Sequence, residues 1–361
     1  MKPTHLLDGV RREATILAIL SLLLLSSGCS RRIYDVVYPT LSDGKYDTEF
    51  PYKNCSTQLE EIARTIKRVN HIAHYKGYLF SRDQGLKIGD LSQIKLKDVA
   101  RSEWIYHQTG SGTATVIYAA DHRLALLTCA HIVAAPDTVI TYYQESAADN
   151  GLIVQSVSIK QRQSDYVVDI PDGSDMQILA LDAKKDIAII GKTQHQAGNM
   201  PLPIFSYPAG QAEKLEWGSF VYVMGFPMGN KMITRGIVSN PRNDPSGSFL
   251  VDALFNRGFS GGLVLAIKDG VPNFELVGMA KSVSANSEYV LRPEKTVDEF
   301  AYDPNLAYTG DIHVEMKREI NYGITHALSM EAIRGFFKEN DRALRRSGFY
   351  FKAFLEEDGS K

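Results

Sequence analysis

Residues 252–263 read DALFNRGFSGGL. Ser260 stands there in a glycine-rich turn, directly before an apolar run that begins at Leu263. Glycine adopts backbone conformations that other residues avoid, and it lets a substrate chain approach the backbone closely. A serine hydroxyl is a poor nucleophile at neutral pH unless a neighbouring base takes its proton. The stretch therefore predicts a nucleophilic serine in a tight loop, and it requires a base from elsewhere in the chain.

A histidine and an aspartate stand at the ends of two other apolar runs. His131 lies just beyond the run Leu124–Thr128, and Asp186 opens the run Ile187–Ile190. In a Ser-His-Asp triad the histidine takes the serine proton, and the aspartate holds the imidazole tautomer and stabilises the imidazolium. We therefore expect His131 to be the base of Ser260 and Asp186 to be the acid that orients it.

The proposed site also needs backbone N–H donors, and two other residues are alternatives for its acid and its base. The N–H groups of Gly258 and Ser260 are expected to bind the oxyanion that forms during acyl transfer. Asp182 is an alternative acid, but it falls before the apolar strand instead of at its start. His122 lies in a predicted hairpin turn, where solvent is its expected environment.

Short β-type runs dominate the chain from about Gly110 onward, and helical patterns flank them. Many short strands separated by Asp, Gly, Pro and Asn predict an all-β barrel or sandwich. Apolar residues at steps of three and four predict a helix over residues 57–75, within a helical extension spanning 57–100. A second helix is predicted over 329–340, and residues 341–361 are expected to form a charged tail. The predicted strands are 113–118, 124–128, 152–159, 177–181, 187–190, 218–225, 233–239, 249–253, 263–267 and 275–283.

Several ordered motifs carry a family resemblance. The segments TCAH at 128–131, DIAII at 186–190 and GFSGG at 258–262 resemble the T-A-A-H, D-x-A-x-[LI] and G-N-S-G-G elements of trypsin-like serine peptidases, most closely the bacterial Deg/HtrA branch. Supporting matches are GSG at 110–112, GFP at 225–227, GIVS at 236–239 and INYGI at 320–324. The resemblance implies two six-stranded antiparallel β-barrels over residues 101–340, in a serine endopeptidase whose relatives often form trimers. We expect no PDZ domain, because too few residues follow residue 340.

Some positions depart from that family pattern and bear on substrate binding. Phe259 replaces the usual asparagine, where it could shape a pocket. Leu254, six residues before the nucleophile, falls where this fold has the base of the S1 pocket, which implies a preference for apolar side chains at P1. Ala280 and Lys281 complete the candidates for substrate contact.

The N-terminal residues predict export. Charged residues precede the apolar run Ala14–Leu25, and SSGC follows at 26–29. This pattern resembles a bacterial lipoprotein signal over residues 1–28, with Cys29 as the lipidated cysteine and residues 29–56 as a tether; an ordinary cleaved signal peptide is the alternative. We therefore expect a lipid anchor in the bacterial envelope, facing the periplasm or the exterior. The net charge of −2 argues against nucleic acid as a partner, and polypeptides are the expected substrates.

Cysteines and histidines leave two further possibilities. Cys55 and Cys129 would share an oxidising compartment and could pair, although two separate buried thiols are the preferred interpretation. His71 and His74 would lie one turn apart on the predicted helix, but no third metal ligand is evident. We therefore expect neither a metal ion nor a cofactor.

Two other classes of protein compete with a trypsin-like peptidase. Gly258-x-Ser260-x-Gly262 also fits the nucleophile elbow of α/β-hydrolases. That elbow runs from a strand into a helix, whereas residues 263–267 are typical of a strand, and βα alternation is missing from the sequence. A catalytically inactive trypsin-fold scaffold or binding protein of the envelope is the more serious alternative, because Phe259 departs from the family pattern beside the serine.

Overall fold

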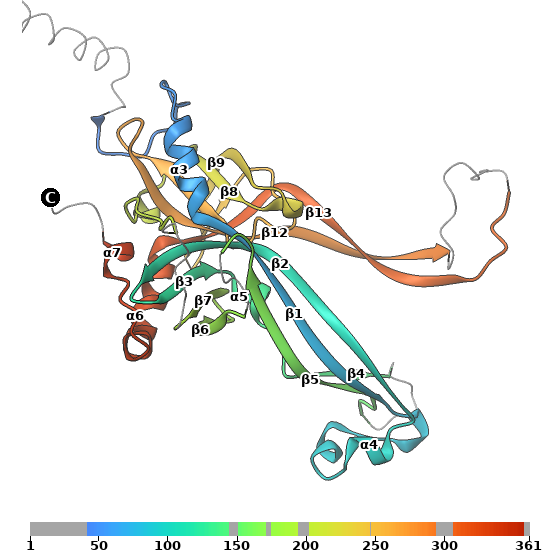
Figure 1. The fold of residues 1–361 in the computed structure, drawn as a ribbon. Helices are drawn as coiled ribbons and strands as arrows, with labels where there is room; N and C mark the ends of the chain where they lie inside the picture. The colour runs from blue at the N-terminus through green and yellow to red at the C-terminus, as the bar shows by residue number, and fades with distance from the viewer. Residues whose placement is uncertain are drawn as a thin grey trace, which may run out of the picture.

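The computed structural model describes residues 42–143, 151–170, 175–193, 202–245, 247–293 and 306–356. Two β-sheets form the body of the molecule, and two long β-ribbons project from it in different directions (Figure 1). The predicted signal sequence, Cys29 and the first part of the tether lie outside the described residues. Within the described ranges, no helix has the length and apolar character needed to cross a membrane.

The sheet that carries the Ser260 loop closes into a six-stranded antiparallel barrel in the order β10-β13-β12-β11-β8-β9. Its interior is lined by buried aliphatic and aromatic residues, among them Val223, Phe249, Val264 and Val277. The strands are β8 (Phe220–Gly225), β9 (Met232–Asp244), β10 (Ser248–Val251), β11 (Leu263–Ile267), β12 (Phe274–Pro293) and β13 (Ile312–Ser329). Short 3-10 helices cover Ala212–Lys214 and Pro227–Gly229.

The other sheet has seven strands in the order β4-β5-β1-β2-β3-β7-β6. It forms an open half-barrel, whereas the family resemblance implied a closed barrel of six strands. The difference arises because β1 pairs between β5 and β2, which leaves β4 and β6 at two separate edges. The strands are β1 (Ile66–Leu79), β2 (Ser102–Ala120), β3 (Arg123–Thr128), β4 (Thr138–Tyr142), β5 (Val154–Val167), β6 (Gln177–Asp182) and β7 (Ile187–Lys192).

The helix predicted over residues 57–75 is wrong in its second half. Helix α3 covers Ser56–Thr65, and the chain continues directly as strand β1. The odd-numbered residues from Val69 to Tyr75 are buried, whereas the even-numbered residues between them are more exposed, so side chains alternate with the period of two expected for a strand. The rest of the predicted helical extension holds only single turns: the 3-10 segments Arg82–Gln84 and Ile88–Ser92, and α4 (Leu96–Val99).

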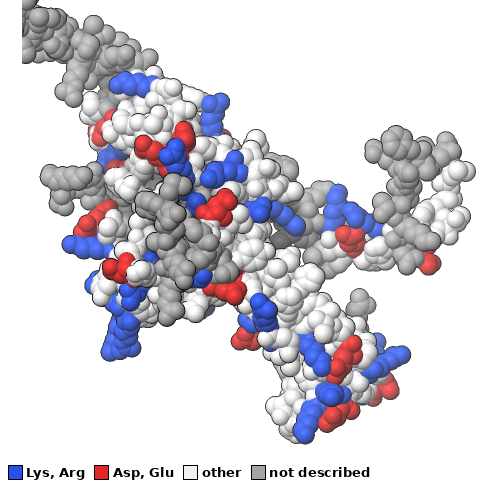
Figure 2. Space-filling model, in the orientation of Figure 1, with Lys and Arg blue, Asp and Glu red and all other residues white. Residues whose placement is uncertain are grey.

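The two ribbons give the molecule its extended outline. Strands β1, β2 and β5 run far beyond the body as one ribbon, with α4 at its end (Figure 1). Lys and Arg side chains intermingle with Asp and Glu side chains at that end (Figure 2). Strands β12 and β13 form the other ribbon, in which residues 285–293 pair with residues 312–320. Its exposed apolar side chains include Tyr289, Leu291, Val314 and Met316.

The C-terminal residues pack on the body instead of forming the expected loose charged tail. Helix α6 spans Met330–Arg346 and is followed by α7 (Lys352–Leu355). Phe349, Phe351 and Phe354 are buried beyond α6. The Tyr118 ring of β2 lies 5.5 Å from the Phe349 ring and 5.7 Å from the Phe351 ring, both edge-on. This aromatic cluster closes the core of the open sheet.

The last part of the predicted tether also belongs to the body. Tyr46 and Asp47 are buried beside the closed barrel. The Asp47 N–H donates to the Ile267 carbonyl at 2.9 Å, and the Phe220 N–H donates to the Asp47 carbonyl at 2.8 Å. Residues 46–47 therefore bridge β11 and β8 instead of spacing the domain from a membrane.

Candidate active site

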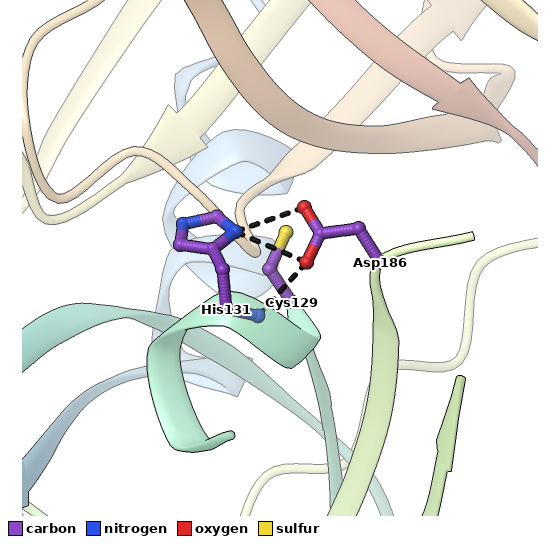
Figure 3. Close-up of side chains that lie close together, drawn as sticks. All are labelled: Cys129, His131 and Asp186. Atoms are coloured by element: carbon purple, nitrogen blue, oxygen red, sulfur yellow. Dashed lines mark hydrogen bonds and ion pairs between the residues drawn. The ribbon is translucent and has the colours of Figure 1, made fainter. Parts of the chain in front are cut away.

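His131 and Asp186 are in direct contact (Figure 3). His131 lies in α5 (Ala130–Val133), the single helical turn that follows β3, and Asp186 directly precedes β7, the partner strand of β3. The His131 Nδ1 atom lies 2.8 Å from Asp186 Oδ2 and 3.1 Å from Oδ1, and the His131 N–H donates to Oδ1 at 2.8 Å. The other ring nitrogen faces away from the carboxylate (Figure 3). This arrangement fixes the orientation of the imidazole.

The two ends of this pair differ in their access to solvent. The Asp186 side chain is 12% exposed, whereas the His131 side chain is 49% exposed. Asp186 has a φ of +63°, a left-handed conformation that aspartate tolerates better than most residues. A sheltered carboxylate behind an accessible imidazole is the arrangement that a histidine base requires, because the reacting nitrogen must reach substrate.

Asp182, the alternative acid, has a structural role instead. Its Oδ1 accepts the N–H groups of Lys184 and Lys185 at 2.9 and 3.0 Å. The backbone hydrogen bond from Lys185 holds the pKa of the Asp182 carboxyl below its usual value. Asp182 therefore stabilises the turn that leads into β7, and Asp186 is the acid that contacts the histidine.

The Ser260 loop is held against the open sheet by hydrogen bonds from β2. The Thr113 N–H donates to the Ser260 carbonyl at 2.8 Å, and Thr113 Oγ1 donates to the Gly258 carbonyl at 2.7 Å. The Gly261 N–H donates to the Ala280 carbonyl at 2.8 Å, which ties the loop to β12 as well. These bonds hold the Ser260 loop of the closed barrel against the open sheet, which supplies His131.

Ser260 itself is partly buried. No hydrogen bond joins its hydroxyl to His131 among the interactions of the described residues. Catalytic hydrogen bonds are often long or poorly aligned in a free enzyme and shorten when substrate binds.

The loop backbone leaves two N–H groups for a ligand. Within the described ranges, neither the Gly258 N–H nor the Ser260 N–H donates a hydrogen bond to the protein. Gly258 has a φ of +108°, and a Cβ at this position would collide with the Phe226 carbonyl. Only glycine fits here, so the residue type that the sequence suggested is required by the fold.

Cys129 completes a close group with His131 and Asp186, whose potential ligand atoms all lie within 4.8 Å of one another. Metal binding by cysteine requires the thiolate. Burial, and next the nearby Asp186 charge, raise the pKa of the Cys129 thiol well above its usual value, and its Sγ donates to the Ala280 carbonyl at 3.5 Å. These residues fit a neutral packed thiol beside a histidine–carboxylate pair better than a metal centre. Cys55 and Cys129 are both free and buried, as the preferred interpretation expected.

The four residues expected to contact substrate divide into two groups. Leu254 is 63% exposed and Lys281 is partly exposed, so both can meet a ligand, although Leu254 lies at the surface and not on a sheltered pocket floor. Phe259 and Ala280 are buried, at 1% and 0% exposure. Phe259 packs on the Phe255 ring at 5.5 Å in the barrel core. The assignment of Phe259 and Ala280 to substrate contact is therefore wrong; both support the Ser260 loop from behind.

Sequence reasoning missed a second histidine–carboxylate pair. His71 Nδ1 lies 2.6 Å from Asp165 Oδ1, and both side chains are nearly inaccessible. His71 and Asp165 face each other across β1 and β5. His71 and His74 fall on opposite faces of a strand and cannot act as a metal pair. The pair was hidden because residues 66–75 were interpreted as a helix, which conceals the pairing with β5.

Comparison with protein-family models agrees with this architecture. Residues 111–279 match the family model of the trypsin-like peptidase domain, and that span contains His131, Asp186 and Ser260. The chain therefore carries a trypsin-like peptidase domain, which confirms the resemblance seen in its motifs. A crystal structure of the serine endoprotease from Yersinia pestis is similar at 16% sequence identity and a TM-score of 0.38, over 81% of this chain and 68% of that chain. No curated protein matches the chain by sequence.

Proposed function

We propose that this protein is a serine endopeptidase in which Ser260 is the nucleophile, His131 the general base and Asp186 the residue that orients the base. The observation that carries the proposal is the bond of the Asp186 carboxylate to His131 Nδ1, which leaves the opposite ring nitrogen for proton transfer. The trypsin-like peptidase domain over residues 111–279 supports the same reading.

The mechanism follows from these positions. His131 takes the proton of the Ser260 hydroxyl as its oxygen attacks the peptide carbonyl, and the Asp186 carboxylate stabilises the imidazolium. The N–H groups of Gly258 and Ser260 donate to the oxyanion of the tetrahedral intermediate. His131 then protonates the leaving amine, which leaves an acyl group on Ser260. Water, deprotonated by His131, hydrolyses this ester and restores the free serine.

A fluorophosphonate probe tests the nucleophile, because it forms a covalent bond only with an activated serine. We expect labelling of a protein comprising residues 30–361 and none of its Ser260→Ala variant. Ser92→Ala, at an exposed position on the distant ribbon, is the matched control and should label like the wild type. Absence of Ser260-dependent labelling, with and without added peptide, would instead favour a trypsin-fold scaffold without catalysis.

Leu254 supports a preference for apolar side chains at P1. It is an exposed apolar side chain on the chain segment that leads to Ser260. Cleavage of a randomised peptide library should show apolar residues before the cut bond. A preference for Lys or Arg at that position would contradict this part of the proposal.

Envelope proteins are the proposed substrates, because the N-terminal sequence is typical of a lipoprotein signal over residues 1–28, followed by Cys29. Cells that express the full chain and are fed a tagged fatty acid should incorporate the tag into the protein. The Cys29→Ser variant should lose it, whereas Cys55→Ser should retain it. Labelling that persists in Cys29→Ser would refute anchoring at this cysteine.

A further inference from the structure

A cavity of about 530 Å³ adjoins the Ser260 loop. Strands β1, β2 and β5 supply one part of its wall. The other part comes from Phe226, Met228 and Gly229 and from the loop residues Arg257 and Gly258. Gly110 and Ser111 of β2 also line it, next to Gly112, where a Cβ would lie 3.0 Å from the Ser260 carbonyl. The cavity therefore opens beside the proposed oxyanion donor, and a substrate bound at Ser260 passes close to it.

The wall of this cavity is cationic. Arg68 and Arg257 both line it, and no Asp or Glu is among the described residues that do so. The Arg68 Nε atom is buried and has no hydrogen-bond partner in the described part of the chain. A buried polar atom without a partner costs free energy, about 1–3 kcal/mol and more for a charged group. Arg68 thus both lines the cavity and carries an unsatisfied donor.

His71 adds a further polar group to the same wall. Its Nδ1 is bonded to Asp165, and the Gln163 side-chain amide donates to the other Asp165 oxygen at 2.7 Å and to the Val133 carbonyl at 2.8 Å. Both oxygens of the Asp165 carboxylate are therefore hydrogen-bonded to protein groups. The remaining ring nitrogen, Nε2, is left for the cavity that His71 lines.

Positive charge continues around this wall. The Lys231 ammonium lies 5.5 Å from the centre of the Phe226 ring, which also lines the cavity. An anion entering this region would be attracted by several cations at once.

We propose that this cavity binds a carboxylate of the peptide substrate through Arg68 and Arg257, close to the bond that is cut. Arginine presents paired donors that match the two oxygens of a carboxylate, which gives both strength and orientation. The carboxylate belongs either to an Asp or Glu side chain or to the terminus of the substrate. This inference rests on the proposed peptidase function, but the binding it describes is measured without catalysis.

The test uses the Ser260→Ala variant of residues 30–361 and three pools of randomised octapeptides. All are acetylated and lack Lys and Arg; the first is amidated and has no acidic residue, the second is amidated with one Glu, and the third has no acidic residue and a free C-terminal carboxylate. Retention in equilibrium dialysis is measured by mass spectrometry. We expect the second or the third pool to bind about tenfold or more tightly than the first, the size of a charged hydrogen bond. Enrichment of only one of the two identifies the source of the carboxylate.

Variants then assign the effect to the cavity. Arg68→Gln and Arg257→Gln should each reduce the advantage of the acidic pool severalfold, and Arg346→Gln, an exposed arginine of α6, should retain it. If the Arg68→Gln variant does not fold, the Arg257→Gln variant, at an exposed position, tests the inference by itself. Equal binding of all pools, or an advantage that neither cavity variant reduces, overturns the inference. Serine labelling by fluorophosphonate is a separate measurement, so failure of the peptidase proposal is distinguishable from failure of this one.

Discussion

Thr113 and Gly258 are joined by a buried hydrogen bond, in which Thr113 Oγ1 donates to the Gly258 carbonyl at 2.7 Å. The same hydroxyl accepts the Phe226 N–H at 2.9 Å, and the Thr113 carbonyl accepts the Thr128 hydroxyl at 2.7 Å. Thr113 belongs to the open sheet, whereas Gly258 and Phe226 belong to loops of the closed barrel. The side chain and the carbonyl of this one residue therefore fix the loop of the proposed nucleophile relative to the strand that leads to the proposed base.

Replacing Thr113 by valine should damage both stability and activity. Valine keeps the shape but leaves the Gly258 carbonyl and the Phe226 N–H without their partner, so we expect the free energy of unfolding to fall by about 1–3 kcal/mol. Because the loop loses its anchor, the rate of Ser260 labelling should fall by about 10- to 100-fold. Urea denaturation and fluorophosphonate kinetics measure the two effects.

Thr115→Val is the matched control for that change. Thr115 is equally buried on the same strand, but its hydroxyl has no hydrogen-bond partner in the described structure. Its replacement should leave labelling unchanged and should not lower stability. A Thr113→Val variant that behaves like Thr115→Val would show that the Thr113 hydroxyl does not hold the loop.

Asp186→Asn should lower the rate of peptide hydrolysis by on the order of 10³- to 10⁴-fold, because an amide favours the wrong imidazole tautomer. Asp182→Asn is the comparison, since Asp182 accepts backbone N–H groups and pairs with the Lys185 ammonium at 3.6 Å in the turn before β7, without contacting His131. It should reduce stability slightly and leave the rate within a few-fold of the wild type. If the two variants have similar rates, Asp186 does not orient the base.

Asp47 should make the protein less stable as the pH rises. Burial raises the pKa of its carboxyl from an ordinary 3.8 to about 6, so the folded protein still binds this proton where the unfolded chain has released it. The stabilising contribution is present below about pH 4 and is lost as the pH rises through about 6. At pH 8, Asp47→Asn should therefore raise the free energy of unfolding by about 1–3 kcal/mol.

The control for this pH effect is the exposed Asp98 of α4. Asp98→Asn should leave the free energy of unfolding close to that of the wild type, and the gain from Asp47→Asn should disappear near pH 4. A gain that is the same at pH 4 and pH 8 would mean that packing, and not ionisation, is responsible.

Phe354→Ala should destabilise the open sheet. The Phe354 ring lies 5.7 Å from the Phe337 ring and 6.3 Å from the Phe205 ring, and the residue is buried. Removing a buried phenylalanine leaves a cavity and costs about 3–5 kcal/mol. Tyr350→Ala, at a residue that is 56% exposed, should cost far less by the same thermal denaturation assay. Equal effects would indicate that the residues after α6 do not form part of the core.

The sequence predicted those parts of the fold that depend on residues close together along the chain. Each of the ten predicted strands overlaps an observed one, because short runs of β-branched residues between turn residues have few alternatives. The contact of His131 with Asp186 was also predictable, since both residues stand at the ends of apolar runs that pair as β3 and β7.

Features that depend on distant pairing were not predictable in the same way. Ile62, Ile66, Val69 and Ala73 fit the spacing of a helix, but pairing with β2 and β5 makes residues 66–79 a strand. Nothing in the motif around Ser260 reveals that Phe259 points into the barrel core. Thr113 is one threonine in a β-rich run, and only the fold brings it to the Ser260 loop.

The aromatic cluster beyond α6 has a consequence for the order of folding. Tyr118 is synthesised long before Phe349 and Phe351, the rings that cover it. Until these rings emerge from the ribosome, the nascent open sheet exposes an apolar surface that chaperones bind readily. The core of the open sheet is therefore complete only after almost the whole described chain has been synthesised.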